Sequence, residues 1–274
     1  MAIDFTVLTK DEEKSPLAKY FGMEKARPNP QVMEILVKGP MNPDKALPLE
    51  SINDLLDPSY HEFENGYCIL DNGVGYIAVN NILPGCTVDM MKWWFAWHCL
   101  EDIRYKIWDA GKHGAIAISD VDRKKILNPD IPIEEKYTDV THFVVEDVGC
   151  GFEDILISFK TVAGMGFDQD KLKKSPVKEI FGGFGVSESR EHPGNKSPAI
   201  MMHLCSEIDG GIKLRTFFYM GCRINNGIPM CVLPPGVRIP IEAPMGLAFH
   251  NVEEYSNLAA LLPKVYKEFG PDVN

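Results

Sequence analysis

The sequence is poor in basic residues, with 28 Lys and Arg against 39 Asp and Glu and a net charge of −11 at pH 7. Proteins that bind nucleic acid or an anionic membrane surface present concentrated positive charge. The excess of acidic residues argues against such a concentration of positive charge, so neither nucleic acid nor membrane is an expected partner. A length of 274 residues suffices for one domain with a sizeable core, and a single domain is expected.

The sequence also lacks closely spaced cysteines and long apolar runs. Its seven cysteines are scattered without any C-x-x-C pair, which favours reduced thiols buried as small apolar side chains. The N-terminus has no basic start followed by an apolar core, and no window approaches roughly eighteen apolar residues. These features predict neither a signal peptide nor a membrane span, and they indicate a cytoplasmic protein.

Prolines interrupt residues 1–65, which are predicted to form an extended arm packed on the body, residues 66–274. Hairpins are predicted at "GYCILDNGVGYIAVN" (66–80) and "SPAIMMHLCSEIDGGIKLRTFFYMGC" (197–222). Helices are predicted over 87–108, apolar on nearly all sides, and over 247–269, which has an apolar stripe of period 3.6. The pattern predicts an α+β fold of antiparallel strands with helices on one face.

The stretch "AFHNVEEY" (248–255) places His250 and Glu254 four residues apart in the predicted final helix, so they share one face. Such a pair is typical of a solvated ion pair or of a first-turn acid that complements the helix dipole. It also suits two ligands of a metal ion. Zinc takes three or four His, Cys or carboxylate ligands in total, so further residues are required.

Two other residues are candidates for the remaining ligands. His113 follows the predicted tryptophan-rich helix, where an ordinary loop histidine is the alternative interpretation. In "THFVVEDVG" (141–149), strand alternation puts His142, Val144 and Glu146 on one face, so an acid shares a side with apolar neighbours. A carboxylate that faces inwards requires a polar or ionic partner.

The runs "WWFAWHCLEDIRYKIWD" (93–109), "KH" (112–113), "THFVVEDVG" and "FHNVEEY" resemble the carbon–carbon hydrolases that cleave phloretin and 2,4-diacetylphloroglucinol. The resemblance extends over about residues 60–270. It implies a helix-grip fold, shared with birch-pollen-allergen-like and START-like domains, in which a curved antiparallel sheet clasps a long C-terminal helix. Residues 66–274 would then form the catalytic domain, and the protein would be a homodimer.

The resemblance also implies a zinc cofactor and a set of site residues. The zinc ligands would be His113, Glu146, His250 and Glu254. The residues that hold the phenolic ring would be Tyr105, His192, His203 and Tyr219. Taken without the resemblance, His192 in "REHPG" suits an exposed loop, and His203 in "MMHLC" suits a core histidine. The family's polar residue three positions after the first histidine ligand is Ile116 here, which is a departure from the family pattern.

The implied activity is that of a hydrolase acting on carbon–carbon bonds in ketonic substances. Zinc-activated water would split an acyl-phloroglucinol between ring and acyl carbonyl. Phloretin would give phloroglucinol and 3-(4-hydroxyphenyl)propanoate, and 2,4-diacetylphloroglucinol would give its monoacetyl form. Two alternatives remain: a non-catalytic helix-grip carrier of polyphenols, and a metal-dependent aromatic polyketide cyclase or decarboxylase.

Overall fold

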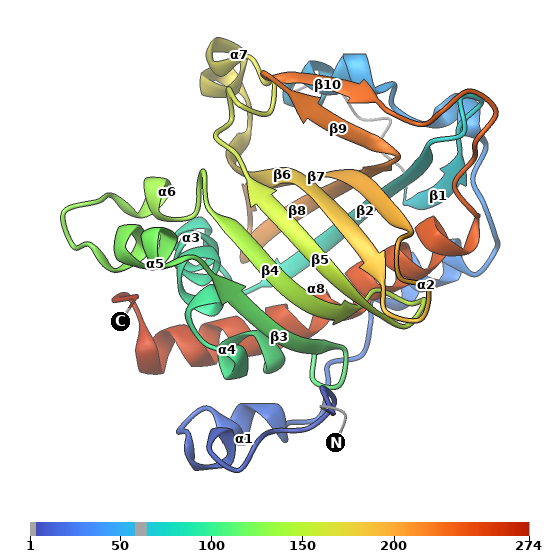
Figure 1. Cartoon of the computed structure of the whole chain (residues 1–274). Coiled ribbons are helices and arrows are strands. Elements are labelled where there is room, and N and C mark those ends of the chain that lie inside the picture. Colours follow the sequence, from blue (N-terminus) through green and yellow to red (C-terminus); the bar gives the residue numbers. More distant parts are fainter. Residues whose placement is uncertain (1–3, 58–64, 274) are drawn as a thin grey trace.

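A computed structural model describes residues 4–57 and 65–273 of the chain. One antiparallel sheet of eight strands dominates it, in the order β1-β2-β8-β7-β6-β5-β4-β3 (Figure 1). The strands are β1 (Gly66–Ile69), β2 (Gly75–Pro84), β3 (His113–Ile118), β4 (Thr141–Asp147), β5 (Phe152–Phe159), β6 (Val177–Ser189), β7 (Lys196–Ile208) and β8 (Gly211–Met220). Both predicted hairpins are present, as β1–β2 and β7–β8.

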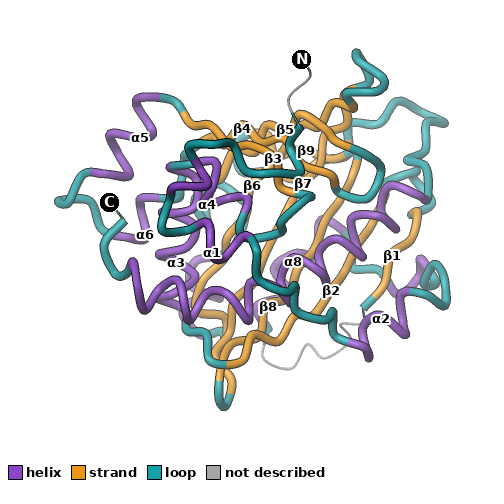
Figure 2. The backbone as a smooth tube through the Cα atoms, turned by 90° about the horizontal axis from the view of Figure 1, so that it is seen from below, coloured by secondary structure: helices purple, strands orange, loops and turns teal. Residues whose placement is uncertain are grey.

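The long helix α8 (Glu242–Phe269) lies across one face of this sheet (Figures 1 and 2). Its apolar stripe is buried: Leu247 and Val252 contact β1 and β2, and Leu258, Leu262 and Val265 join the core beneath the tryptophan-rich segment. A sheet that clasps a long C-terminal helix is the helix-grip fold, so the predicted α+β class is confirmed. Within the described residues, no helix is long and apolar enough to cross a bilayer.

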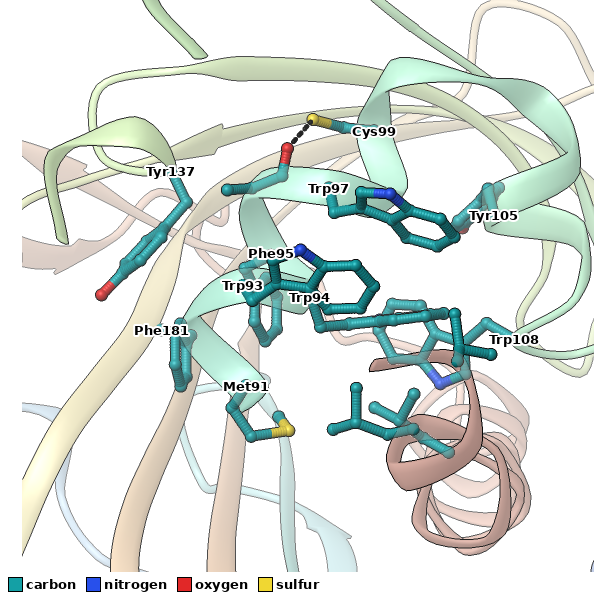
Figure 3. Packing of buried hydrophobic residues seen from close by; sticks show 14 of the residues in the cluster. Met91, Trp93, Trp94, Phe95, Trp97, Cys99, Tyr105, Trp108, Tyr137 and Phe181 are labelled. Atoms are coloured by element: carbon teal, nitrogen blue, oxygen red, sulfur yellow. Dashed lines mark hydrogen bonds between the residues drawn. The ribbon is translucent and has the colours of Figure 1, made fainter. Parts of the chain in front are cut away.

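The tryptophan-rich segment fills the space between the sheet and the C-terminal half of α8 (Figure 3). It forms α3 (Val88–Trp97), whose N-terminus is capped by the Thr87 hydroxyl, then a 3₁₀ turn (His98–Leu100) and α4 (Asp102–Lys106). The predicted single helix over 87–108 is therefore broken. Glu101 adopts an extended backbone, and the Asp102 side chain accepts a hydrogen bond from the Ile116 N–H of β3. The break directs α4 towards the start of β3.

The N-terminal segment contains short helices that include α1 (Ala18–Phe21), α2 (Pro30–Leu36) and a 3₁₀ stretch (Leu49–Leu56). The prolines that suggest breaks in the sequence begin α2 and a 3₁₀ turn (Pro43–Lys45), each capped by a preceding asparagine. The segment is tied to the body, since Lys19 pairs with Glu268 at 2.6 Å. The remaining elements are α5 (Asp120–Leu127), α6 (Ile133–Lys136), α7 (Gln169–Lys174), β9 (Cys222–Asn225) and β10 (Ile228–Cys231).

Candidate metal centre

Three elements bring His113, Glu146, His250 and Glu254 to one place under the sheet. His113 opens β3 and is paired in register with Glu146 of β4. Alternation along β4 turns Glu146 towards α8, with Val144 and His142 on the same side and Phe143 exposed. One turn of α8 separates His250 from Glu254, and both face β4. All four residues are buried, with exposures of 1 to 8%.

The four side chains present their ligand atoms to one another. Glu146 Oε1 lies 2.7 Å from His250 Nε2 and 3.4 Å from His113 Nε2. Glu254 Oε2 lies 3.7 Å from His113 Nε2 and 3.9 Å from His250 Nε2. A tetrahedral zinc ion with bonds of about 2.05 Å holds its ligand atoms roughly 3.3 Å apart. The observed separations bracket that value, and one ligand atom from each residue lies within 4.8 Å of all the others.

The other ring nitrogens show how the two imidazoles are oriented. His113 Nδ1 donates to the backbone carbonyl of Tyr105 at 3.2 Å, which leaves Nε2 with its lone pair towards the cluster. That Nε2 is buried and has no hydrogen-bond partner in the described residues. His250 Nδ1 lies 3.6 Å from the buried carboxylate of Asp109. A carboxylate or carbonyl behind a histidine is the usual support of a metal ligand, so the residues present fit a divalent ion.

The charges in the cluster are strongly coupled. Burial lowers the pKa of His250, but the hydrogen bond with Glu146 and the charges of Glu254 and Glu146 outweigh it and raise that pKa to about 9. Burial raises the pKa of Glu254 to about 8. Burial also disfavours the Glu146 carboxylate, yet the two histidines hold its pKa well below the usual range. Two acids and two bases this close favour a bound cation that would neutralise the carboxylates.

A second layer of polar residues holds the cluster, and the sequence prediction missed most of it. The Tyr105 hydroxyl donates to Glu146 Oε2 at 2.6 Å, and Asn251 donates to Glu254 Oε1 at 3.1 Å. Lys25, in the N-terminal segment, pairs with Asp109. Asn251 precedes Glu254 by three residues on the helix, a spacing that a sequence can reveal. The contact of Asp109 with His250 carries no such signal, because it joins residues 141 positions apart.

A predominantly apolar cavity lies between the cluster, α3 and the inner face of the sheet. Its walls include Phe95, Trp108, Val144, Phe159 and Tyr255. Of the predicted ring-holding residues, Tyr105 and His203 line this cavity. His203 is 3% exposed, and its Nδ1 is bonded to the Thr216 hydroxyl at 2.8 Å. Burial lowers the pKa of His203 to about 3, so the ring is neutral.

The structure does not bring the other two predicted ring-holding residues to the cavity. His192 is exposed in the connection between β6 and β7. Tyr219 is fully buried on the opposite face of β8, where its hydroxyl donates to the Leu47 carbonyl at 2.8 Å. Its neighbours Phe218 and Met220 face the cavity instead. Strand alternation is the physical reason, because adjacent residues of β8 point to opposite faces of the sheet.

The fold and the site define a class: a helix-grip protein with a buried His₂Glu₂ cluster, suited to a metal ion, at the wall of an apolar cavity. Residues 47–267 match the family described as the DAPG hydrolase PhiG domain, and the chain belongs to that family. It is an enzyme of the hydrolase class.

Similar proteins include a phloretin hydrolase of Eubacterium ramulus, 31% identical over 94% of this chain and 92% of that protein. A 2,4-diacetylphloroglucinol hydrolase of a Pseudomonas species is 30% identical over 93% of this chain and 88% of that protein. Among solved structures, the crystal structure of Ara h 8.0201 covers 69% of this chain and 98% of that chain, at 9% identity and a TM-score of 0.39.

Proposed function

We propose that the protein hydrolyses the carbon–carbon bond between a phloroglucinol-type ring and an acyl carbonyl, with zinc held by His113, Glu146, His250 and Glu254. The observation that carries the proposal is the convergence of these four buried ligand groups at the wall of an apolar cavity. The matched relatives are named for phloretin and 2,4-diacetylphloroglucinol, and both compounds contain an acylated phloroglucinol ring. Phloretin is the preferred candidate substrate.

The reaction adds the elements of water across the bond. The hydroxyl group joins the acyl carbon to give a carboxylic acid, and the proton joins the ring carbon that the acyl group leaves. A bound divalent ion supplies a Lewis acid for the carbonyl oxygen and makes a water molecule more acidic at neutral pH. The ring hydroxyls beside the acyl group allow a keto form, in which the departing ring leaves as a stabilised enolate rather than as an aryl anion.

The protein groups around the cluster have distinct tasks in this proposal. Tyr105 holds the Glu146 carboxylate through its hydroxyl and lies at the cavity wall, where its oxygen can accept a hydrogen bond from a ring hydroxyl. Neutral His203 offers Nε2 to another, because its Nδ1 is engaged by Thr216. Glu254, which lines the cavity at the cluster, is the proposed base that takes a proton from water. Groups fixed in a dry cavity stabilise developing charge with little reorganisation.

The test uses purified protein with phloretin and with 2,4-diacetylphloroglucinol, each with and without a chelator, followed by mass spectrometry. The expected result for phloretin is phloroglucinol and 3-(4-hydroxyphenyl)propanoate, with about one zinc ion per chain and no products after chelation. If the protein contains no metal and binds the polyphenol tightly without altering it, the function would be that of a carrier and not of a hydrolase. A product that gains no water would favour a cyclase or decarboxylase.

Three further properties belong to the same proposal. The protein would be cytoplasmic, since its seven cysteines are free thiols. It would form a homodimer, as is expected for the matched family. Residues 1–65 would form an arm on a catalytic domain of residues 66–274. Light scattering of the purified protein measures the mass of the assembly, and limited proteolysis measures whether the arm is separable.

A further inference from the structure

The end of the cavity remote from the cluster contains a buried histidine whose Nε2 has no hydrogen-bond partner among the described residues. His142 lies on β4 four residues before Glu146 and faces the same side of the sheet. It is 2% exposed, and its Nε2 has no hydrogen-bond partner among the described residues. A buried polar atom left unpaired costs folding free energy, and such an atom at a cavity wall is expected to meet a ligand or a water molecule.

A second imidazole lies beside it. The His98 ring is 5.3 Å from the His142 ring in an edge-to-face arrangement. His98 Nδ1 donates to the Trp94 carbonyl at 2.7 Å, so its Nε2 carries the lone pair and can accept a hydrogen. Burial lowers the pKa of His98 to about 4. Burial, and then the nearby His98, hold the pKa of His142 well below its ordinary value. Both rings are neutral, which suits an uncharged hydroxyl rather than an anion.

The walls of this end are aromatic and closed. Phe159 lies 4.7 Å from the His142 ring, and Phe95 lies 5.7 Å from the His98 ring. These residues are all buried, whereas Ser187 and Ser197, which line the cavity beside the strand connections, are partly exposed. A flat ring with polar substituents fits the closed end, and a chain of variable length fits the open end. Phloretin and 2,4-diacetylphloroglucinol share the trihydroxylated ring and differ in their acyl groups, since phloretin has one long acyl chain and 2,4-diacetylphloroglucinol has two acetyl groups.

Distance selects one substituent of the ring. Glu146 follows His142 by four positions along β4, which corresponds to about 13 Å of strand. The two hydroxyls ortho to the acyl group lie beside the carbonyl, and the carbonyl must be near the cluster to react. Only the hydroxyl para to the acyl group points away from the cluster. It is therefore the substituent that reaches the closed end.

We propose that His142 Nε2, assisted by His98 Nε2, binds the ring hydroxyl para to the acyl group and so selects trihydroxylated over dihydroxylated rings. This inference rests on the proposed function. His142 acts here as a binding residue: it forms a hydrogen bond to the hydroxyl and transfers no proton. In the sequence, strand alternation indicates only which face of the strand His142 lies on. The structure adds that its buried Nε2 has no hydrogen-bond partner in the part of the chain that is described, and this observation supports the binding role.

The test combines a variant with a substrate analogue. His142→Phe keeps a ring in the cavity and removes both nitrogens, and Phe143→Leu, on the exposed face of the same strand, is the control. Each protein is assayed with phloretin and with its analogue that lacks the para ring hydroxyl. The ratio of kcat/KM for phloretin to kcat/KM for the analogue should be about tenfold higher in the wild type and in the control than in His142→Phe. Intrinsic reactivity cancels, because both proteins meet the same two compounds.

Binding without chemistry completes the test. 2-Propylphloroglucinol and 2-propylresorcinol have no carbonyl to hydrolyse and differ only in the hydroxyl para to the chain. Calorimetry should show that His142→Phe loses about tenfold in affinity for the first compound while its affinity for the second is unchanged. Melting temperature and zinc content verify that the variant is folded. An unchanged preference in His142→Phe overturns the inference, as does a preference that depends on the phenol of the acyl chain. If the wild type hydrolyses neither compound, the proposed function fails, and the binding comparison still decides the role of His142.

Discussion

The two ends of the cavity use the same residue type in opposite ways. At the cluster end, carboxylates outweigh the effect of burial and raise the pKa of His250 to about 9. At the far end, aromatic walls surround His98, and burial lowers its pKa to about 4. Both histidines are nearly inaccessible to solvent. The comparison teaches that the neighbours of a buried imidazole, rather than its burial alone, decide whether it suits an ion or a neutral hydroxyl.

The largest effect is expected from a substitution that removes a charged ligand at the cluster end of the cavity. Glu254→Gln should lose bound zinc and reduce turnover on the order of 1,000-fold, since a ligand that stabilises the ion is replaced by a neutral amide. The matched control is Glu253→Gln, which alters the adjacent acid that pairs with Lys112 and is outside the cluster. Metal analysis and steady-state kinetics measure both variants. Equal zinc content in the two would contradict the ligand set.

A smaller loss is expected behind His250. Asp109→Asn keeps the shape of the side chain and removes the charge that faces His250 Nδ1 at 3.6 Å. Such supporting residues contribute roughly 10 to 100-fold to metal affinity. Competition with a chromogenic chelator measures the change. An affinity equal to that of the wild type would mean that Asp109 serves only the ion pair with Lys25.

Tyr105→Phe tests the residue that lies between the two ends. It removes the hydroxyl that donates to Glu146 Oε2 at 2.6 Å, and a hydrogen bond to a carboxylate of this kind should be worth about tenfold in turnover. With excess zinc present, the effect should divide between kcat and KM if the oxygen also meets the ring. A change in metal affinity alone would limit Tyr105 to a role in holding Glu146.

The protonation of the cluster predicts how metal binding depends on pH. His250 carries a proton at neutral pH in the metal-free protein, because its pKa is raised to about 9. A metal ligand must be unprotonated, and the pKa of Glu254 is also raised, to about 8, so binding at neutral pH releases up to two protons. Metal affinity should fall by roughly tenfold for each pH unit of acidification between the two pKa values, and more steeply below both. Calorimetry in two buffers of different ionisation enthalpy counts the protons. A buffer-independent enthalpy would show that none is released.

The smallest effect on turnover is expected at Tyr219. Tyr219→Phe removes the hydroxyl bonded to the Leu47 carbonyl on the far face of β8. Loss of this buried hydrogen bond should lower the free energy of unfolding by about 1 kcal/mol and leave kcat/KM unchanged. Denaturant unfolding and kinetics measure the two quantities. A large fall in kcat with full stability would restore Tyr219 to the site.

The sequence predicts the inner face of β4 and misses that of β8 for one physical reason. Along β4, Phe143 is exposed and Val144 is buried, so alternation shows which side Glu146 takes. Strand β8 is central and buried on both faces, and residues 214–219 are all buried. Its sequence therefore lacks the alternation that would separate Phe218 from Tyr219. Phe218, which lines the cavity, and Tyr219, which faces away from it, are both buried aromatic residues and cannot be distinguished by the sequence pattern.

The final helix shows a similar limit. Its apolar stripe predicts a helix over 247–269, and the helix in fact begins at Glu242. Pro244 suggests a break in the sequence, but it lies in the first turn, where a backbone N–H has no partner within the helix. The pair His250 and Glu254 was predictable from its spacing. Their meeting with Glu146 depends on how the helix lies on the sheet, which local sequence does not encode.

The order of the ligands along the chain has a consequence for biosynthesis. His113 and Glu146 belong to β3 and β4, whereas His250 and Glu254 belong to α8, which follows every strand of the sheet. A ribosome therefore completes all eight strands before the second half of the metal centre leaves the exit tunnel. Capture of the proposed metal ion by all four residues requires the docking of α8 on the sheet, so loading of the ion in the cell would report on that docking.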